Sequence, residues 1–188
     1  MTNGQANKSG EIARRWWESL QPDRDAGRKG DAGALARLRR ASLIEAMSEE
    51  TVVRLHRALG LPRQQFPRAA LVACVLSHAR DHERRLSVAR AGGQTGEENG
   101  VLSALRFRRL LTIRGEEDCA IAFRRLVALL GGKVNVADLG KSLLDWNDEE
   151  RGDKCRTRWA FDYFDAGAAA PADAPDPQTE TKPETETA

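Results

Sequence analysis

Apolar residues recur at helical spacing along most of this chain, and that pattern limits the fold more than any other feature of the sequence. In residues 48–60, SEETVVRLHRALG, the side chains of Val52, Leu55 and Leu59 fall on one side of a helix. A glycine, Gly60, follows the last apolar residue, as is common where a helix ends. The sequence contains no alternating runs rich in β-branched residues, which would indicate strands. It therefore predicts an all-α protein.

Residue types that favour helix beginnings precede several of these segments. Asp31 precedes AGALARLRR and Asn135 precedes VADLGKSLLDW, and both side chains can accept hydrogen bonds from the free amides of a first helical turn. Ser48 is expected to cap the helix that contains Val52 in the same way. Pro67 is expected in the first turn of a further helix, RAALVACVLSHARDH, because its missing amide proton is tolerated there.

We expect these helices to form two small bundles, over residues 1–90 and 101–165. The stretch between them, residues 91–100, reads AGGQTGEENG and has the composition of a flexible loop. Residues 166–188 have no aromatic side chain, no large aliphatic side chain and four prolines, so we expect a disordered tail. The tail carries five carboxylates against one lysine, a net charge of −4, in a chain whose net charge is +2. The part expected to fold is therefore basic.

Several classes of protein are excluded by what the sequence lacks. There is no P-loop, no Gly-x-Gly-x-x-Gly and no Gly-x-Ser-x-Gly, so nothing indicates an enzyme or a nucleotide cofactor. No run of about 18 apolar residues is present to cross a membrane, and the N-terminal residues do not resemble a secretory signal. Three cysteines without paired spacing fit reduced thiols. We expect a cytoplasmic protein.

Cys74, His78 and His82 follow one another at four-residue spacing and are residue types that bind zinc. On one straight helix, however, the three positions span about 12 Å of rise, too far to converge on one ion. Cys74 also lies on the apolar side, where a free cysteine packs as a small hydrophobic residue. The sequence therefore predicts neither a metal site nor a cofactor.

The tetrad Phe-Arg-Arg-Leu occurs twice, at residues 107–110 and 123–126. On a helix, the phenylalanine and leucine face the core, the first arginine flanks that apolar stripe, and the second arginine points outward. Arg109 and Arg125 are thus expected on the surface. At this point two interpretations stay open: solvated helix faces whose arginine stems cover apolar neighbours, or a ridge that binds phosphate groups through bidentate guanidinium contacts.

The ordered series LSALRFRRLL, AFRRLVALLGGKVNVADLGKSLLDWND and RTRWAFDYF resembles the CasB family, the small subunit of the Cascade complex of type I-E CRISPR systems. The resemblance includes LARLRRA and LSHARDH and extends over about residues 35–164. It implies a non-catalytic, all-helical protein whose partners are other Cascade subunits with their guide RNA, a second copy of itself, and the single-stranded DNA of the R-loop. Such a subunit helps to hold the displaced non-target strand and to stabilise the R-loop in antiviral defence.

The resemblance also implies that basic surface residues contact nucleic acid. The predicted contact residues are Arg39, Arg40, Arg106, Arg108, Arg109, Arg124, Arg125, Lys133, Arg156 and Arg158. Contacts to the phosphate backbone ignore base sequence, which suits a subunit that serves any guide. R-loop formation is nearly balanced in base-pairing energy, so a few such contacts can favour it.

Two other functions remain open from the sequence. Residues 122–146 could form a helix–turn–helix of a transcription regulator, although Asp138 and Asp145 on the second helix would oppose DNA phosphates. Alternatively, the chain could be a spacer subunit whose arginines contact neighbouring proteins.

Overall fold

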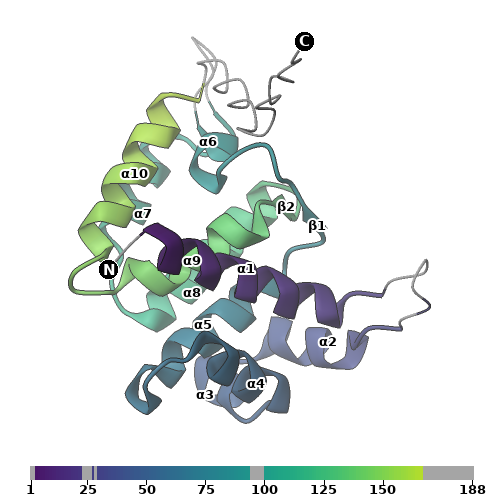
Figure 1. Ribbon diagram of the computed structural model, residues 1–188. Helices are drawn as coiled ribbons and strands as arrows, with labels where there is room; N and C mark the ends of the chain where they lie inside the picture. The colour runs from purple at the N-terminus through teal and green to yellow at the C-terminus, as the bar shows by residue number, and fades with distance from the viewer. Residues whose placement is uncertain (1–2, 23–26, 28, 94–99, 167–188) are drawn as a thin grey trace, which may run out of the picture.

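The computed structural model describes residues 3–22, 27, 29–93 and 100–166, and within them the protein is built from ten α-helices (Figure 1). The helices are α1 (Asn3–Leu20), α2 (Ala32–Arg40), α3 (Leu43–Met47), α4 (Glu50–Leu59), α5 (Phe66–Leu76), α6 (Val88–Gly92), α7 (Ala104–Thr112), α8 (Glu116–Leu129), α9 (Val136–Trp146) and α10 (Gly152–Phe164). A 3-10 turn, η1 (Arg63–Gln65), precedes α5. A two-residue parallel pairing joins β1 (Asp81–His82) to β2 (Lys133–Val134). The all-α prediction is confirmed.

Two of the expected N-terminal caps are present. The Asp31 carboxylate accepts a hydrogen bond from the Ala34 amide at 2.8 Å and begins α2. The Asn135 side chain accepts one from the Asp138 amide at 3.1 Å and begins α9. At its other end, α4 terminates at Gly60, whose positive φ of 62° is unfavourable for residues with a side chain.

The cap expected at Ser48 is wrong. A five-residue helix, α3, ends at Met47 with Ser48 as its C-terminal cap, and α4 follows Glu49, which makes no side-chain capping bond. The capping box lies one helix earlier, where Ser42 accepts a hydrogen bond from the Glu45 amide and the Glu45 carboxylate accepts one from the Ser42 amide. Pro67 lies in the first turn of α5 as predicted.

Helix α5 lies at the centre of the molecule. All of residues 69–76 are buried, as expected for a helix that is apolar on every side. It packs against α3 and α4 from the first half of the chain and against α8 and α9 from the second, and Figure 1 shows it between these groups. The core therefore contains side chains from both halves.

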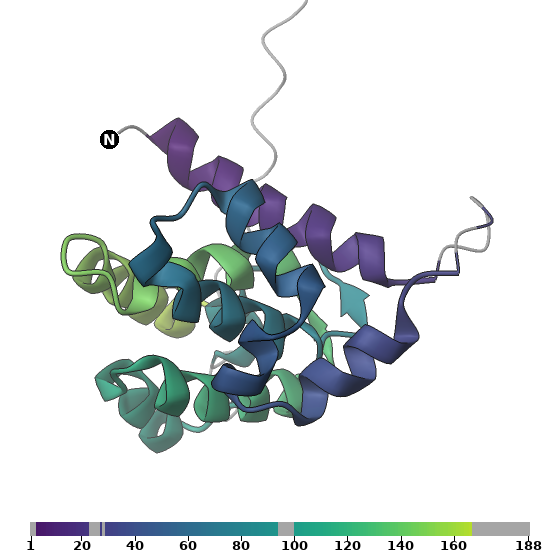
Figure 2. The same ribbon diagram turned by 90° about the horizontal axis from the view of Figure 1, so that it is seen from below.

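A second contact between the halves is the crossing of α1 over α9, the most extensive packing between any two elements of the described chain (Figures 1 and 2). The backbones approach closely because small residues line the contact. A Cβ atom on Gly140 would lie 2.6 Å from the Cβ of Ala13, and one on Gly10 would lie 2.5 Å from the carbonyl oxygen of Ala137. The buried apolar residues form a continuous cluster through both halves.

Three of the earlier expectations are not decided by the fold. The division into two bundles stays a prediction about how the chain is organised. Residues 94–99 of the expected loop and residues 167–188 of the expected tail lie outside the described residues.

Within the described part, no helix is both long enough and apolar enough to cross a membrane.

The phenylalanines of the two tetrads are buried, as predicted, and aromatic contacts fix both helices. Phe107 of α7 stacks on Tyr163 of α10, with ring centroids 3.8 Å apart. Phe123 of α8 meets Trp146 and Trp159 edge to face, at 4.9 and 5.5 Å. Since aromatic pairs of this kind add to the energy of burial, they hold α7 and α8 in fixed positions against α9 and α10.

Candidate nucleic-acid interface

Helices α7 and α8 carry one tetrad each, and together they line a groove of about 620 Å³. Leu110 and Leu126, the last residues of the two tetrads, belong to its apolar lining. Arg106, Arg109 and Arg125 are its charged residues, and we call them the groove arginines. The second arginines of both tetrads thus lie along the same groove, one on each helix.

The groove arginines are exposed, as the helical spacing predicts for Arg109 and Arg125. Arg106 and Arg109 are three positions apart and therefore neighbours on the surface of α7. None of the three guanidinium groups forms an ion pair or a hydrogen bond with another described residue. Three positive charges are consequently available to an anion outside the protein.

Arg40 and Arg108 are also exposed, and their guanidinium groups have no partner among the described residues. Arg39 is exposed as well, but its Nε donates a hydrogen bond to the Ser77 carbonyl oxygen at 2.7 Å. Lys133 lies 3.5 Å from the Glu83 carboxylate. An exposed ion pair is weak, so Lys133 remains accessible to a ligand. Arg39 remains accessible through its two Nη atoms, which have no partner among the described residues.

Arg124, the first arginine of the second tetrad, extends into the protein. Its Nη2 donates a hydrogen bond to the Ala41 carbonyl oxygen at 2.8 Å, just after the end of α2. Its Nε is buried and has no hydrogen-bond partner among the described residues. Burial, together with the nearby charge of Arg124, lowers the pKa of His78, which favours the neutral imidazole.

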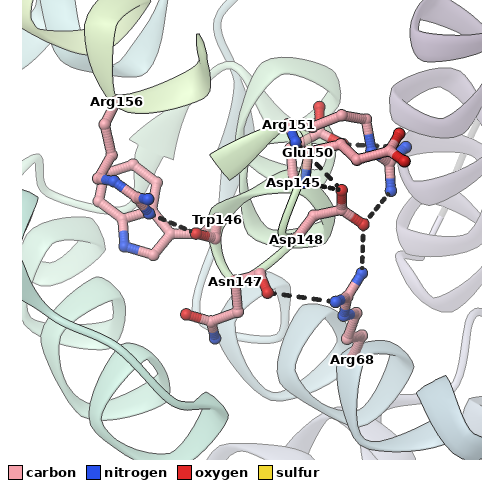
Figure 3. Close-up of polar contacts among 8 residues, drawn as sticks. All are labelled: Arg68, Asp145, Trp146, Asn147, Asp148, Glu150, Arg151 and Arg156. Atoms are coloured by element: carbon pink, nitrogen blue, oxygen red, sulfur yellow. Dashed lines mark hydrogen bonds and ion pairs between the residues drawn. The ribbon is translucent and has the colours of Figure 1, made fainter. Parts of the chain in front are cut away.

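Arg156 and Arg158 of α10 have partners within the fold. Arg156 donates to the Trp146 carbonyl oxygen at 2.6 Å and lies 6.0 Å from the centre of the Trp146 ring (Figure 3). Arg158 donates to Asp138 at 2.6 Å and to Ser142 at 2.8 Å. Of the ten predicted contact residues, Arg124, Arg156 and Arg158 are therefore the ones whose guanidinium groups are directed mainly at the protein itself.

A further polar cluster connects α5 to the segment after α9 (Figure 3). Arg68 and Arg151 each donate to the Asp148 carboxylate at 2.8 Å, and Arg68 also donates to the Asn147 carbonyl oxygen at 3.2 Å. The hydrogen bonds from Arg151 and Arg68 lower the pKa of Asp148. Arg151 also lies 3.2 Å from Asp145. The cations of this cluster are paired, which makes the cluster a structural connection.

The helical arrangement assumed for Cys74, His78 and His82 is wrong, because α5 ends at Leu76. His82 lies in β1, and its Nδ1 accepts a hydrogen bond from the Val136 amide at 3.1 Å. Cys74 remains in α5 and is fully buried. Among the described residues there is no group of three or more His, Cys, Asp or Glu side chains placed to hold a metal ion.

Sequence reasoning missed a second basic groove, of about 680 Å³, between α1 and α4. Arg15, Lys29 and Arg54 are among its lining residues, with Trp16. Arg54 lies 4.0 Å from Glu50, at the limit of an ion pair. The adjacent arginines in ARRWW resemble the paired arginines of the tetrads and are the one local signal of this groove.

Comparisons with known proteins agree on one family. The model of the family described as CRISPR-associated protein Cse2 (CRISPR_cse2) matches residues 34–164, from within α2 to the end of α10. The crystal structure of CasB from Thermus thermophilus is similar to this chain, with a TM-score of 0.61 and 28% sequence identity. That similarity covers 82% of this chain and 96% of the other. No curated protein matches the chain significantly.

Proposed function

The chain belongs to the CRISPR-associated Cse2 family, and from this membership we propose that it is the small, non-catalytic subunit of a type I-E Cascade complex. In this role it holds the displaced non-target DNA strand and stabilises the R-loop. Its partners are the other Cascade subunits with their guide RNA, single-stranded DNA and a second copy of the chain, in the cytoplasm. The observation that carries the proposal is the meeting of Arg106, Arg109 and Arg125, all without partners among the described residues, along one groove.

The chemistry of the groove suits the backbone of a single strand. Each guanidinium group that replaces a counterion at a phosphate favours binding through counterion release. The groove lining contains no tryptophan, tyrosine or phenylalanine, so the base stacking that many single-strand sites use has no platform there. We therefore expect contacts to phosphates, with Arg40, Arg108, Arg39 and Lys133 as further contacts outside the groove. For Arg124, Arg156 and Arg158 a contact to nucleic acid remains a prediction.

The environment of α9 argues against a transcription regulator of the helix–turn–helix type. That interpretation uses α9 as the helix that enters the DNA major groove. In this fold α9 packs against α1, α5 and α10, and eight of its residues are buried. Asp138 and Asp145 are engaged as well, since Asp138 accepts from the Val88 amide and Asp145 is paired with Arg151.

The test is reversal of two charges in the groove, by Arg109→Glu and Arg125→Glu together. We expect weaker capture of single-stranded DNA by the assembled complex. We also expect the plot of log affinity against log salt to become less steep by about 1.4, from a slope of about 0.7 per phosphate contact on single strands. Far-UV circular dichroism should be unchanged, because neither side chain has a partner in the described fold.

The matched control reverses two exposed arginines that do not line the groove, Arg57→Glu and Arg63→Glu. If the two double variants weakened binding equally, binding would depend on the net charge of the chain and not on the position of the groove arginines. That outcome would contradict the proposal. Sequence-specific binding of duplex DNA by the isolated chain would favour a regulator. Failure of the groove residues to cross-link to DNA within the complex would favour a spacer subunit.

A further inference from the structure

We propose that residues 167–188, the acidic segment that follows α10, bind the groove between α7 and α8 in the same chain and exclude nucleic acid from it. Binding of the segment to the groove depends only on the charges and positions described below. Its competition with nucleic acid rests on the proposed function.

The first argument is where the acidic segment begins. Near the end of α10, the Tyr163 hydroxyl donates a hydrogen bond to the carbonyl oxygen of Leu102 at 2.7 Å, and Leu102 lines the groove. The Tyr163 ring stacks on Phe107 of α7. Ala166 lies beside Gly93, because a Cβ atom on that glycine would be 2.6 Å from the Cβ of Ala166. The chain thus leaves α10 at the end of the groove where α7 begins.

The second argument is reach. Asp173, the first carboxylate of the segment, follows Ala166 by seven positions, which an extended chain spans in roughly 25 Å. Helix α7 has nine residues and is therefore about 14 Å long. The remaining carboxylates extend to Glu186. Every part of the groove is within reach of at least one carboxylate.

The third argument is complementarity. The segment has five carboxylates and one lysine, whereas the groove has three arginines whose guanidinium groups lack partners among the described residues. Carboxylates and guanidinium groups form bidentate, charge-assisted hydrogen bonds. Alanines and prolines between the acids offer small apolar surfaces to the leucines of the groove, and prolines reduce the number of conformations that binding must restrict.

Attachment to the same chain makes weak contacts sufficient. A segment attached to the same chain experiences an effective concentration on the order of millimolar, so an affinity of about 0.1–0.5 mM would occupy the groove for roughly 70–90% of the time. A long DNA strand with many phosphates can displace such a segment, whereas short or weakly held nucleic acid cannot. The segment would therefore limit non-specific binding before the complex has opened a target.

The experiment places a photo-cross-linking residue, p-benzoylphenylalanine, at Thr181 of the full chain, and mass spectrometry maps where it reacts. We expect adducts within residues 102–129 at low salt. They should decrease at least threefold when Arg106, Arg109 and Arg125 are changed to glutamine, and at least threefold when a 30-nucleotide single strand is added in excess. Adducts elsewhere, or adducts that survive the arginine changes, would overturn binding of the segment to the groove.

A second measurement uses the full chain with Asp173→Asn, Asp176→Asn, Glu180→Gln, Glu184→Gln and Glu186→Gln, and the affinity for the labelled strand by fluorescence anisotropy. We expect three- to tenfold tighter binding at low salt, against less than twofold for the control Glu149→Gln with Glu150→Gln, which are exposed carboxylates elsewhere on the surface. Unchanged affinity would overturn the competition. If no form of the chain bound the strand, the proposed function would fail, while the cross-links would still decide whether the segment occupies the groove.

Discussion

At the scale of single residues, the arginines of this protein fall into two groups that look alike in sequence. Arg124 and Arg125 are adjacent, yet Arg124 donates to a carbonyl oxygen of another segment while Arg125 lines an open groove. Arg158 has acceptors on α9 at hydrogen-bonding distance. Because a buried or paired guanidinium group must lose its partners to bind a phosphate, only the unpaired group is ready to bind without a cost in protein stability.

A residue-scale prediction concerns Asp148, which accepts hydrogen bonds from Arg68 and Arg151. These bonds lower its pKa in the folded protein below the ordinary value of 3.8. Its stabilising contribution is therefore complete above about pH 4 and is lost as the pH falls through the lower, folded-state pKa. We expect Asp148→Asn to reduce the free energy of unfolding by about 2 kcal/mol at pH 7.

The measurement is urea unfolding at pH 7 and at pH 3, with Glu149→Gln as the control. The difference between Asp148→Asn and the native sequence should begin to shrink toward pH 3, because Asp148 then takes up a proton in the unfolded state while it is still ionised in the folded state. A difference of constant size at both pH values would show that the charge of Asp148 is not what stabilises the fold.

At the scale of elements, the crossing of α1 and α9 depends on the absence of side chains. Gly140 gives α9 a surface on which Ala13 of α1 rests directly. Glycine inside a helix is unfavourable by about 1 kcal/mol relative to alanine, so its presence in the middle of α9 is explained by the close approach. Short elements also connect parts of the fold, since α3 packs against α4 and α5, and β1 pairs with β2.

We expect Gly140→Ala to destabilise the protein by about 1–3 kcal/mol, because the added methyl group would lie 2.6 Å from the Cβ of Ala13. The control is Gly33→Ala in α2, where the nearest atoms to an added Cβ are 3.4 Å away, on the flexible side chain of Arg37. That change should be neutral or stabilise by up to about 1 kcal/mol. Thermal unfolding followed by circular dichroism compares the two, and equal stability of both variants would contradict the packing argument.

At the scale of the whole molecule, the two halves of the chain share one core. α1 packs on α9, and α5 packs on α8 and α9. Arg68 on α5 is paired with Asp148 in the second half. The grooves lie on the outside of this common core, which supports α7 and α8 from beneath through Phe107 and Phe123. A rigid support of this kind keeps the groove arginines at fixed separations.

We expect both halves to unfold together. In the variant Trp16→Phe with Trp17→Phe, tryptophan fluorescence reports only Trp146 and Trp159 of the second half, while far-UV circular dichroism reports helices of both halves. The two probes should give the same urea midpoint, as two-state unfolding requires. Separate midpoints would instead identify two independently stable bundles, divided near residues 91–100.

The sequence by itself determined the all-α class, the caps at Asp31 and Asn135 and the inward phenylalanines of both tetrads. These features depend on residues within one or two helical turns, so spacing along the chain is enough to predict them. Only the tertiary structure decided that Arg109 and Arg125 line one groove, while Arg124 is directed to Ala41, 83 positions away in the chain. The physical reason is that helical periodicity gives the direction of a side chain around its own helix axis, but not which distant segment lies in that direction.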